Sequence, residues 1–219
     1  MELNNYKIER LSKYNHRIKY LSNDLNKKNS QSAIFFDRDG VLIQDSHYIS
    51  NPNKIELLPG VKEILKSSHK AGWLNIVVTN QSGIIKRKLN WQDYNEINFK
   101  MLSLLGKYCD INCIIANSEN PNFKNFWRKP SPEMLLFASS KFKIDFSKSI
   151  MIGDRLSDLE AGANAKIKNL IHVLTGHGQK ERETIDSLIN KKRFTKYKYN
   201  HEVHLINNLN NFPFELLKK

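Results

Sequence analysis

The residues that could do chemistry in this 219-residue chain stand in a few short clusters. Asp37 and Asp39 are one residue apart and are followed by Gly40, which permits the backbone angles of a sharp turn. Two carboxylates so placed can divide the work of nucleophile and of general acid or base. Asp154 adds a third carboxylate, and hard oxygen ligands of this kind suit Mg²⁺.

Phosphoryl transfer is the reaction that suits this set of groups. Because an anionic nucleophile must approach an anionic phosphate, a cation is needed, and Thr79 and Lys129 can add a hydrogen bond and a positive charge. Each cluster alone has a simpler explanation: Asp-x-Asp-Gly as a turn or a fragment of a calcium loop, Lys129 as a solvated charge, Gly153-Asp154 as a helix cap. Their joint occurrence, in this order, favours catalysis.

The elements that must position these residues alternate along the chain. Apolar runs predict buried strands at 33–36, 74–79, 111–116, 149–152 and 169–173, and amphipathic stretches predict helices at 60–71, 91–108, 131–142 and 156–165. This alternation predicts an α/β fold, with a Rossmann-like parallel sheet and helices on both faces. Ligands of such sheets bind beyond the carboxyl ends of the strands, which is where the clusters fall.

The chain divides into an α/β domain over 31–219, which carries the clusters, and a basic N-terminal extension over 1–30. Within the domain we expect a motif-bearing core over 31–176 and a basic segment over 177–219, with a loop and short helix over 177–200 and a last strand and helix over 201–217. Apolar residues three or four apart over 5–22 predict an amphipathic helix in the extension, packed on its own domain or on a partner.

Composition places the protein among ordinary globular chains, with 40% hydrophobic and 26% charged residues. No apolar run approaches the roughly 18 residues that a membrane span needs, and the N-terminus does not resemble a secretory signal. Cys109 and Cys113 are too few for a disulfide framework. We therefore expect a cytoplasmic monomer without a membrane partner.

The net charge of +13 raises the question of a nucleic-acid partner. Residues 1–30 and 177–219 each carry a surplus of four positive charges, so only five of the thirteen lie in the stretch that holds the clusters. Basic tails that aid solubility or attract anions weakly explain this distribution better than a nucleic-acid site does. A small phosphorylated metabolite is the partner that we expect.

The clusters resemble the four motifs of the haloacid dehalogenase-like phosphatases. The matching stretches are Phe35-Phe36-Asp37-Arg38-Asp39-Gly40-Val41, Val78-Thr79-Asn80-Gln81-Ser82-Gly83, Arg128-Lys129-Pro130 and Ile152-Gly153-Asp154. The residues of the first two motifs are similar to those of the heptose 1,7-bisphosphate phosphatases and the related histidinol-phosphatases. The resemblance spans about residues 31 to 176.

This resemblance implies a role for each matching residue. Asp37 would be the nucleophile and Asp39 the acid and base, while Thr79 and Lys129 steady the phosphoryl group. Mg²⁺ would be held by Asp37, Asp154 and the backbone carbonyl of Asp39. The residues that match substrate-contacting positions are Asp45, Ser46, His47, Tyr48, Asn80, Gln81, Ser82, Arg128 and Arg155. Asp158 is either a carboxylate that supports the site or an acid on a helix surface.

Two features separate this chain from parts of the family. Bacterial members of the subgroup usually carry a zinc loop of cysteines and a histidine before Arg-Lys-Pro, whereas residues 117–127 hold neither Cys nor His. We therefore predict no structural zinc. About twenty residues separate Asp39 from Pro59, and one helix, one strand and a loop fill 82–129, so we expect an uncapped, open site.

The leading expectation for the substrate is a heptose 1,7-bisphosphate that loses its 7-phosphate. Histidinol phosphate is the nearest enzymatic alternative, and a nucleic-acid 3′-phosphate is the alternative that the charge supports. Arg38 inside the first motif favours the sugar branch, because nucleic-acid 3′-phosphatases more typically have an apolar residue there. A non-catalytic relative would be expected to lack Asp37 or Asp39, and both are present.

Overall fold

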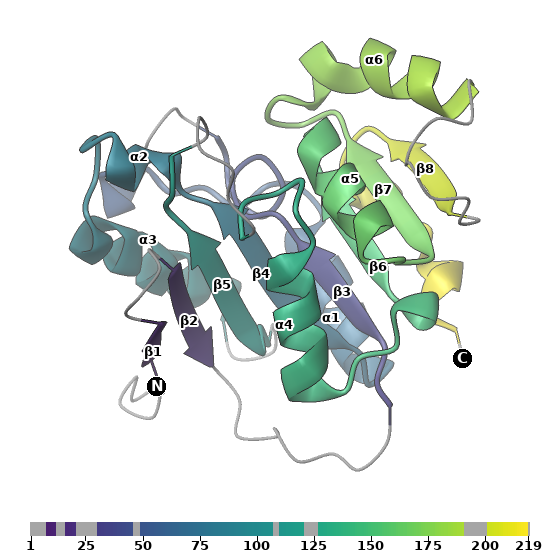
Figure 1. Ribbon diagram of the computed structural model, residues 1–219, viewed down its shortest axis with the longest axis horizontal. Coiled ribbons are helices and arrows are strands. Elements are labelled where there is room, and N and C mark those ends of the chain that lie inside the picture. The colour runs from purple at the N-terminus through teal and green to yellow at the C-terminus, as the bar shows by residue number, and fades with distance from the viewer. Residues whose placement is uncertain are drawn as a thin grey trace.

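The computed structural model describes residues 8–11, 16–20, 30–45, 49–106, 110–120, 127–190 and 201–218. Their strands form one sheet in the order β1-β2-β5-β4-β3-β6-β7-β8 (Figure 1). The six strands from β5 to β8 in this order pair in parallel, as the sequence predicted, and β1 and β2 add antiparallel strands at the β5 edge. The strands are β1 Ile8–Leu11, β2 His16–Tyr20, β3 Ala33–Phe36, β4 Leu74–Asn80, β5 Cys113–Asn117, β6 Ile150–Gly153, β7 Asn169–Val173 and β8 Glu202–Ile206.

Helices cover both faces of the sheet. They are α1 Val61–Lys70, α2 Ser82–Ile85, α3 Trp91–Leu105, α4 Glu133–Phe142, α5 Leu156–Asn164 and α6 Gly178–Asn190. Buried residues of α1 and α3 belong to one apolar cluster, and those of α4, α5 and α6 belong to a second cluster on the opposite face. In Figure 1, α4 accordingly lies in front of the sheet and α1 behind it.

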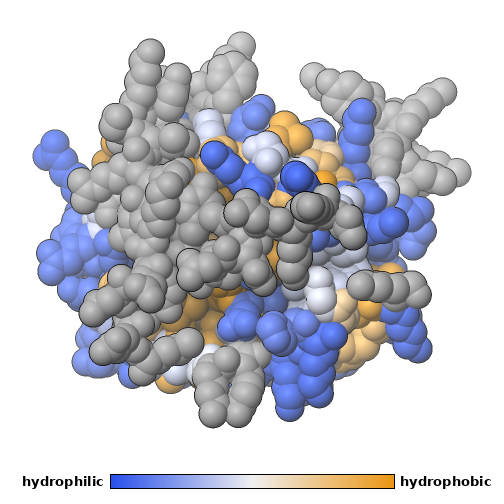
Figure 2. Space-filling view, turned by 90° about the horizontal axis from the view of Figure 1, so that it is seen from below, coloured by the Kyte–Doolittle hydropathy of each residue, from blue (hydrophilic) through white to orange (hydrophobic). Residues whose placement is uncertain are grey.

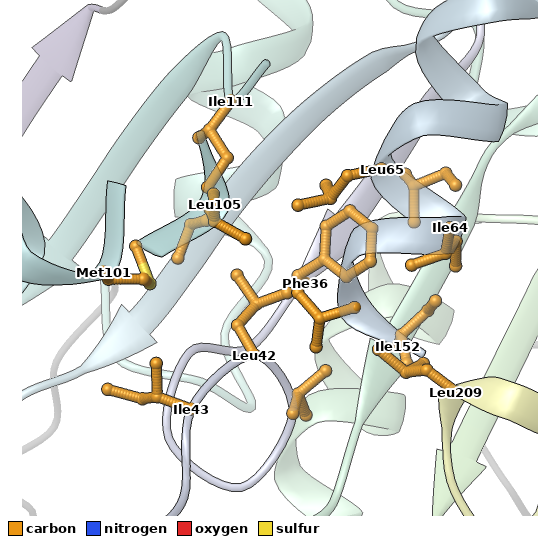
Figure 3. Close-up of a cluster of buried hydrophobic side chains, with 14 of the residues drawn as sticks. Phe36, Leu42, Ile43, Ile64, Leu65, Met101, Leu105, Ile111, Ile152 and Leu209 are labelled. Carbon is orange, nitrogen blue, oxygen red and sulfur yellow. The ribbon is translucent and has the colours of Figure 1, made fainter. Parts of the chain in front are cut away.

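The central strand β3 shows why the sheet is buried on both sides. Its side chains alternate, so that Ile34 and Phe36 enter the first cluster while Ala33 and Phe35 enter the second. Figure 3 shows Phe36 among side chains of α1 and α3, including Leu65 and Met101. All four residues of β3 are fully buried, which explains its unbroken apolar run.

The predicted helix over residues 5–22 is wrong for the part of it that the structure describes. Residues 8–11 and 16–20 instead form the hairpin strands β1 and β2. Strand β2 pairs antiparallel with β5, so it covers an edge that would otherwise be open, and Ile18 is fully buried there. A tertiary partner therefore decided between helix and strand.

The C-terminal segment also differs from the expectation. Helix α6 spans 13 residues, longer than the short helix predicted within 177–200, and residues 191–200 lie outside the described ranges. The predicted last strand is β8, but two 3-10 helices, Leu209–Asn211 and Phe214–Leu217, follow it in place of an α-helix. Phe212 and Leu217 pack into the cluster of α1.

The connections that could hold a cap are short wherever they are described. Between β3 and α1 the structure shows bridges of Ile43 to Asp39 and Leu57 and a 3-10 helix at Pro52–Lys54. Between β4 and α4 it shows α2, α3 and β5. None of the described helices is long and apolar enough to span a membrane.

Candidate active site

The turn after β3 places Asp37 and Asp39 at the carboxyl edge of the sheet. The backbone N–H of Asp37 donates to the Ile152 carbonyl on β6 at 3.0 Å, and the N–H groups of Leu42 and Ile43 donate to the Arg38 carbonyl. Gly40 has φ +86°, and a Cβ atom there would collide with the Asp154 carboxylate. The glycine is therefore required both by the backbone and by the packing of the site.

Lys129 lies at the centre of a buried cluster of charged groups. Its Nζ donates to Asp37 Oδ1 at 2.7 Å and to the Val78 carbonyl at 2.8 Å, and forms an ion pair with Asp158 Oδ1 at 2.6 Å. The Asn80 side chain clamps the backbone of Lys129, since its Oδ1 accepts from the Lys129 N–H and its Nδ2 donates to the Lys129 carbonyl, both at 3.1 Å. Asp158 is therefore part of the site and not a surface acid.

Burial and mutual repulsion shift the titration of this cluster. Burial raises the pKa of Asp37 to about 7, although the Lys129 ammonium opposes the shift. Burial raises the pKa of Asp154 to about 9, and the carboxylates of Asp158 and Asp37 add to the effect. Burial opposes the charge of Lys129, but Asp158 and Asp37 hold its pKa above the ordinary value. Three ionised carboxylates around one ammonium would carry a surplus of negative charge, which is why the pKa values of Asp37 and Asp154 rise.

The carboxylates of Asp37, Asp154 and Asp158 could hold a metal ion, because one oxygen from each lies within 4.8 Å of the others. Asp154 is fully buried, and its Oδ2 accepts from the His177 N–H at 2.7 Å, while its Oδ1 has no hydrogen-bond partner among the described residues. An unsatisfied buried oxygen and three carboxylates around one ammonium fit a divalent cation such as Mg²⁺. Asp158 was not among the predicted ligands, and Asp39 was expected to contribute its carbonyl.

Asp39 is held by two neighbours at the mouth of the site. Arg38 Nη2 lies 3.0 Å from Asp39 Oδ2 and 3.1 Å from Oδ1. Gln81 Nε2 donates to Asp39 Oδ2 at 2.7 Å and to the Thr79 hydroxyl at 2.8 Å. Thr79 is 1% exposed and its hydroxyl is occupied by Gln81, so in this structure the predicted phosphoryl contact lies behind that amide.

A cavity of about 320 Å³ opens over these groups. Most of the predicted site residues line it: Asp37, Asp39, Asp45, Asn80, Gln81, Ser82, Arg128, Lys129 and Arg155. Ser46, His47 and Tyr48 lie outside the described residues, as do residues 121–126 of the segment expected to lack zinc. Asp154 and Thr79 are not among the lining residues, but each is hydrogen-bonded to one of them, Asp154 to His177 and Thr79 to Gln81.

Sequence reasoning missed several residues of this cavity, namely Ile49, Lys86, Leu89, Ser157 and His177. His177 is the most informative, since its ring Nε2 lies 3.0 Å from Asp45 Oδ2 while its backbone N–H bonds Asp154. It follows β7 in the stretch Thr175-Gly176-His177. The rule that parallel strands end at the ligand site could have found it, because β7 is a further strand of the same sheet.

Helix α6 supports the site from outside the cavity. Glu181 Oε2 accepts from the Leu156 N–H at 2.6 Å, which caps α5, and its Oε1 lies 3.9 Å from Arg155 Nη1. Arg182 Nε donates to His172 Nδ1 at 2.9 Å, so the proton of the neutral ring is on Nε2, 3.0 Å from the Asp154 carbonyl. These contacts connect the C-terminal part of the chain to Asp154.

Sequence comparison matches this chain to hydrolases and phosphatases of one family. The family model described as HAD-hydrolase-like matches residues 126–193. A relative from Helicobacter pylori, named D-glycero-beta-D-manno-heptose-1,7-bisphosphate 7-phosphatase, is 34% identical over 143 residues, which are 64% of this chain and 83% of the relative. The protein of the same name from Escherichia coli K12 is 34% identical over 155 residues, 67% of this chain and 81% of that one.

Solved structures agree with the sequence matches. A HAD-like phosphatase of Mesorhizobium loti has a TM-score of 0.70 and 28% identity, covering 74% of this chain and 81% of that one. The D,D-heptose 1,7-bisphosphate phosphatase of B. bronchiseptica, complexed with magnesium and phosphate, has a TM-score of 0.68 and 26% identity. That match covers 82% of this chain and 94% of the other.

Proposed function

The chain belongs to the haloacid dehalogenase-like hydrolases and is a phosphoric monoester hydrolase, and from this premise we propose that it hydrolyses a heptose bisphosphate with Mg²⁺. The proposed reaction releases the 7-phosphate of D-glycero-D-manno-heptose 1,7-bisphosphate. The observation that carries this proposal is the buried cluster of Asp37, Lys129, Asp154 and Asp158 beneath a cavity that Asp39 lines. The choice of a heptose as the sugar rests on the names of the relatives, which are heptose-1,7-bisphosphate 7-phosphatases.

The first step is proposed to form an aspartyl-phosphate. A carboxylate oxygen of Asp37 attacks phosphorus, the bond from phosphorus to the sugar oxygen breaks, and Asp39 gives that oxygen a proton. Lys129 fixes Asp37 Oδ1 through the 2.7 Å contact and places positive charge beside the reacting group.

In the second step Asp39 takes a proton from water, and the water oxygen attacks phosphorus. The bond from phosphorus to Asp37 breaks, which releases phosphate and restores the Asp37 carboxylate and the protonated Asp39. Asp37, Asp154 and the Asp39 carbonyl are the proposed holders of Mg²⁺, which would offset the negative charge of nucleophile and phosphate.

The rim of the cavity supports a substrate with a second anionic group. Lys86, Arg128 and Arg155 line the cavity, each on a different segment, while the lining residues Asp37 and Asp158 are buried. A bisphosphate can place its reacting phosphate over Asp37 and its other phosphate near these cations. The uncapped cavity leaves room for a sugar between the two.

The test is phosphate release from a panel of heptose 1,7-bisphosphate anomers, histidinol phosphate and a 3′-phosphorylated oligonucleotide, each with Mg²⁺ and with EDTA. We expect turnover of one heptose bisphosphate far above the others, and none in EDTA. Asp37→Asn should remove turnover and keep the fold, while Asp110→Asn, a matched change at a half-exposed residue that does not line the cavity, should leave it unaltered.

Each contrary outcome identifies a different error. A preference for the oligonucleotide would show that the charge of +13 was the better guide to the substrate. A preference for histidinol phosphate would retain the mechanism and replace the sugar. Activity retained in Asp37→Asn would remove the covalent mechanism altogether.

A further inference from the structure

Arg38 is a buried cation that the proposed reaction does not use directly. It lies between Asp37 and Asp39 in the turn after β3, and its side chain is only 2% exposed. A guanidinium has five N–H donors and is costly to bury unless they are paired. Burial opposes its charge, but Asp39 holds the pKa of Arg38 above the ordinary value. The partners of Arg38 therefore indicate what it is for.

One side of the guanidinium engages Asp39. Nη2 contacts both carboxylate oxygens, at 3.0 and 3.1 Å, and Nε lies 3.3 Å from Oδ1. Such a two-point contact between planar groups sets the orientation of the carboxylate as well as its charge. Asp39 remains 23% exposed toward the cavity, so the carboxylate is oriented without being closed off.

The other side of the guanidinium is held by helix α3. Nη1 donates to Asn98 Oδ1 at 3.1 Å, and the guanidinium carbon lies 5.0 Å above the centre of the Tyr94 ring. Tyr94 and Asn98 are four residues apart and share the buried face of α3, with exposed fractions of 3% and 1%.

We propose that Asn98 and Tyr94 are positioning residues, which aim Arg38 at Asp39 and so set the orientation of the general acid. The inference rests on the proposed role of Asp39 as acid and base. Asn98 accepts a bond from the Nη1 atom that Asp39 does not use, and the Tyr94 ring supports the plane of the guanidinium. Neither residue is among those that line the cavity, so both act only through Arg38.

The sensitive readout is the dependence of the rate on the leaving group. An alkoxide must receive a proton as it leaves, whereas p-nitrophenolate leaves as a stable anion. Loss of a well-placed acid should therefore slow the alkyl phosphate of the panel that is turned over, and leave p-nitrophenyl phosphate little affected. A purely structural defect would slow both substrates alike.

The experiment measures kcat/KM of Asn98→Leu with both substrates. General acid–base catalysis contributes roughly 10²–10⁴-fold, and the variant keeps Asp39, so we expect a loss of about 10- to 100-fold on the alkyl phosphate. The loss on p-nitrophenyl phosphate should be under about threefold. Tyr94→Phe keeps the ring beneath Arg38 and should lose less on the alkyl phosphate than Tyr94→Leu does.

Met101→Leu is the matched control, since Met101 lies on the same buried face of α3 and its thioether sulfur is only a weak hydrogen-bond acceptor. It should leave both rates unaltered. If Asn98→Leu does not fold, Asn98→Ala removes the same acceptor without adding bulk. Equal losses on both substrates, or none on either, in the variant that folds would overturn the proposal.

Asp39→Asn separates this inference from the proposed function. If that variant lowers kcat/KM equally for both substrates, Asp39 is not the acid and the proposed mechanism itself fails, because kcat/KM does not include the later step in which Asp39 acts as base. If Asp39→Asn discriminates between the substrates and the Asn98 variant does not, the mechanism stands and the positioning role of α3 is wrong.

Discussion

Asp154 is the residue at which the proposed metal requirement can be tested most directly. Its Oδ1 is buried with no partner in the part of the chain that the structure describes, and its Oδ2 accepts a hydrogen bond from the His177 N–H. Asp154→Asn keeps the shape of the side chain and removes a negative charge. We expect it to raise the Mg²⁺ concentration for half-maximal activity by at least about tenfold, which corresponds to about 1.4 kcal/mol.

A thermal readout complements that measurement. Mg²⁺ that binds only the folded protein should raise the melting temperature of the wild type, and the shift should be much smaller in Asp154→Asn. Asp110→Asn again serves as the matched change. An Mg²⁺ titration that is identical in wild type and Asp154→Asn would remove Asp154 from the proposed ligands.

His172 allows a prediction on stability and pH. Burial lowers the pKa of His172 from 6.5 to about 4 in the folded protein. Between these values the unfolded chain binds more protons at this residue than the folded one, so its contribution to stability is lost as the pH falls from about 6.5 to about 4. His172→Gln keeps a donor for the Asp154 carbonyl and cannot titrate in this range.

The measurement is the free energy of unfolding of wild type and His172→Gln across that pH range. We expect the difference between the two proteins to shrink or reverse at low pH, because only the wild type must bury a histidine that tends to protonate. Parallel curves for the two proteins would show that His172 titrates normally in the folded state.

At the scale of elements, the hairpin of β1 and β2 extends the sheet at the β5 edge. Strand β2 pairs with β1 and with β5, and the described residues that line the cavity come from other segments of the chain. Removal of residues 1–29 should therefore leave kcat/KM within about twofold while lowering the melting temperature. The freed edge of β5 should also promote self-association, which size-exclusion chromatography would detect.

Ile18→Ala is the companion variant, because it keeps the strand and empties a fully buried position. A change of this kind costs about 2–5 kcal/mol in a core, and the cost at a sheet edge should lie at the lower end of that range. It should not promote self-association, since β5 stays covered. Full loss of activity in the truncated protein would contradict the separation of hairpin and site.

At the scale of the whole molecule, the net charge of +13 should raise the association rate of an anionic substrate. On the face seen in Figure 2, the described residues present hydrophilic surface interspersed with smaller hydrophobic areas. We expect kcat/KM to fall several-fold as salt rises, because the Debye length shortens from about 10 Å at 0.1 M to about 3 Å at 1 M. The effect should be larger for a bisphosphate than for a monophosphate, and kcat should change little.

The sequence by itself determined the elements whose signals are local. The apolar runs at 33–36 and 169–173 coincide with β3 and β7, because strands buried on both faces need unbroken apolar side chains. Asp37, Lys129 and Asp154 were found because each directly follows a strand or a crossover loop, and parallel strands bring their carboxyl ends together. The order of such residues along the chain is thus enough to predict a shared site.

Only the tertiary structure decided what depends on partners distant in the sequence. The spacing of Ile8, Leu11 and Ile18 is compatible with a helix and with a hairpin. These segments form strands because β2 pairs with the edge of β5 and β1 pairs with β2. Asn80 and Gln81 match substrate-binding positions, yet they also bond Lys129 and Asp39, and no spacing rule assigns those bonds. Asn98 is separated from Arg38 by 60 residues, and it becomes relevant only because a buried guanidinium needs an acceptor that α3 places beside it.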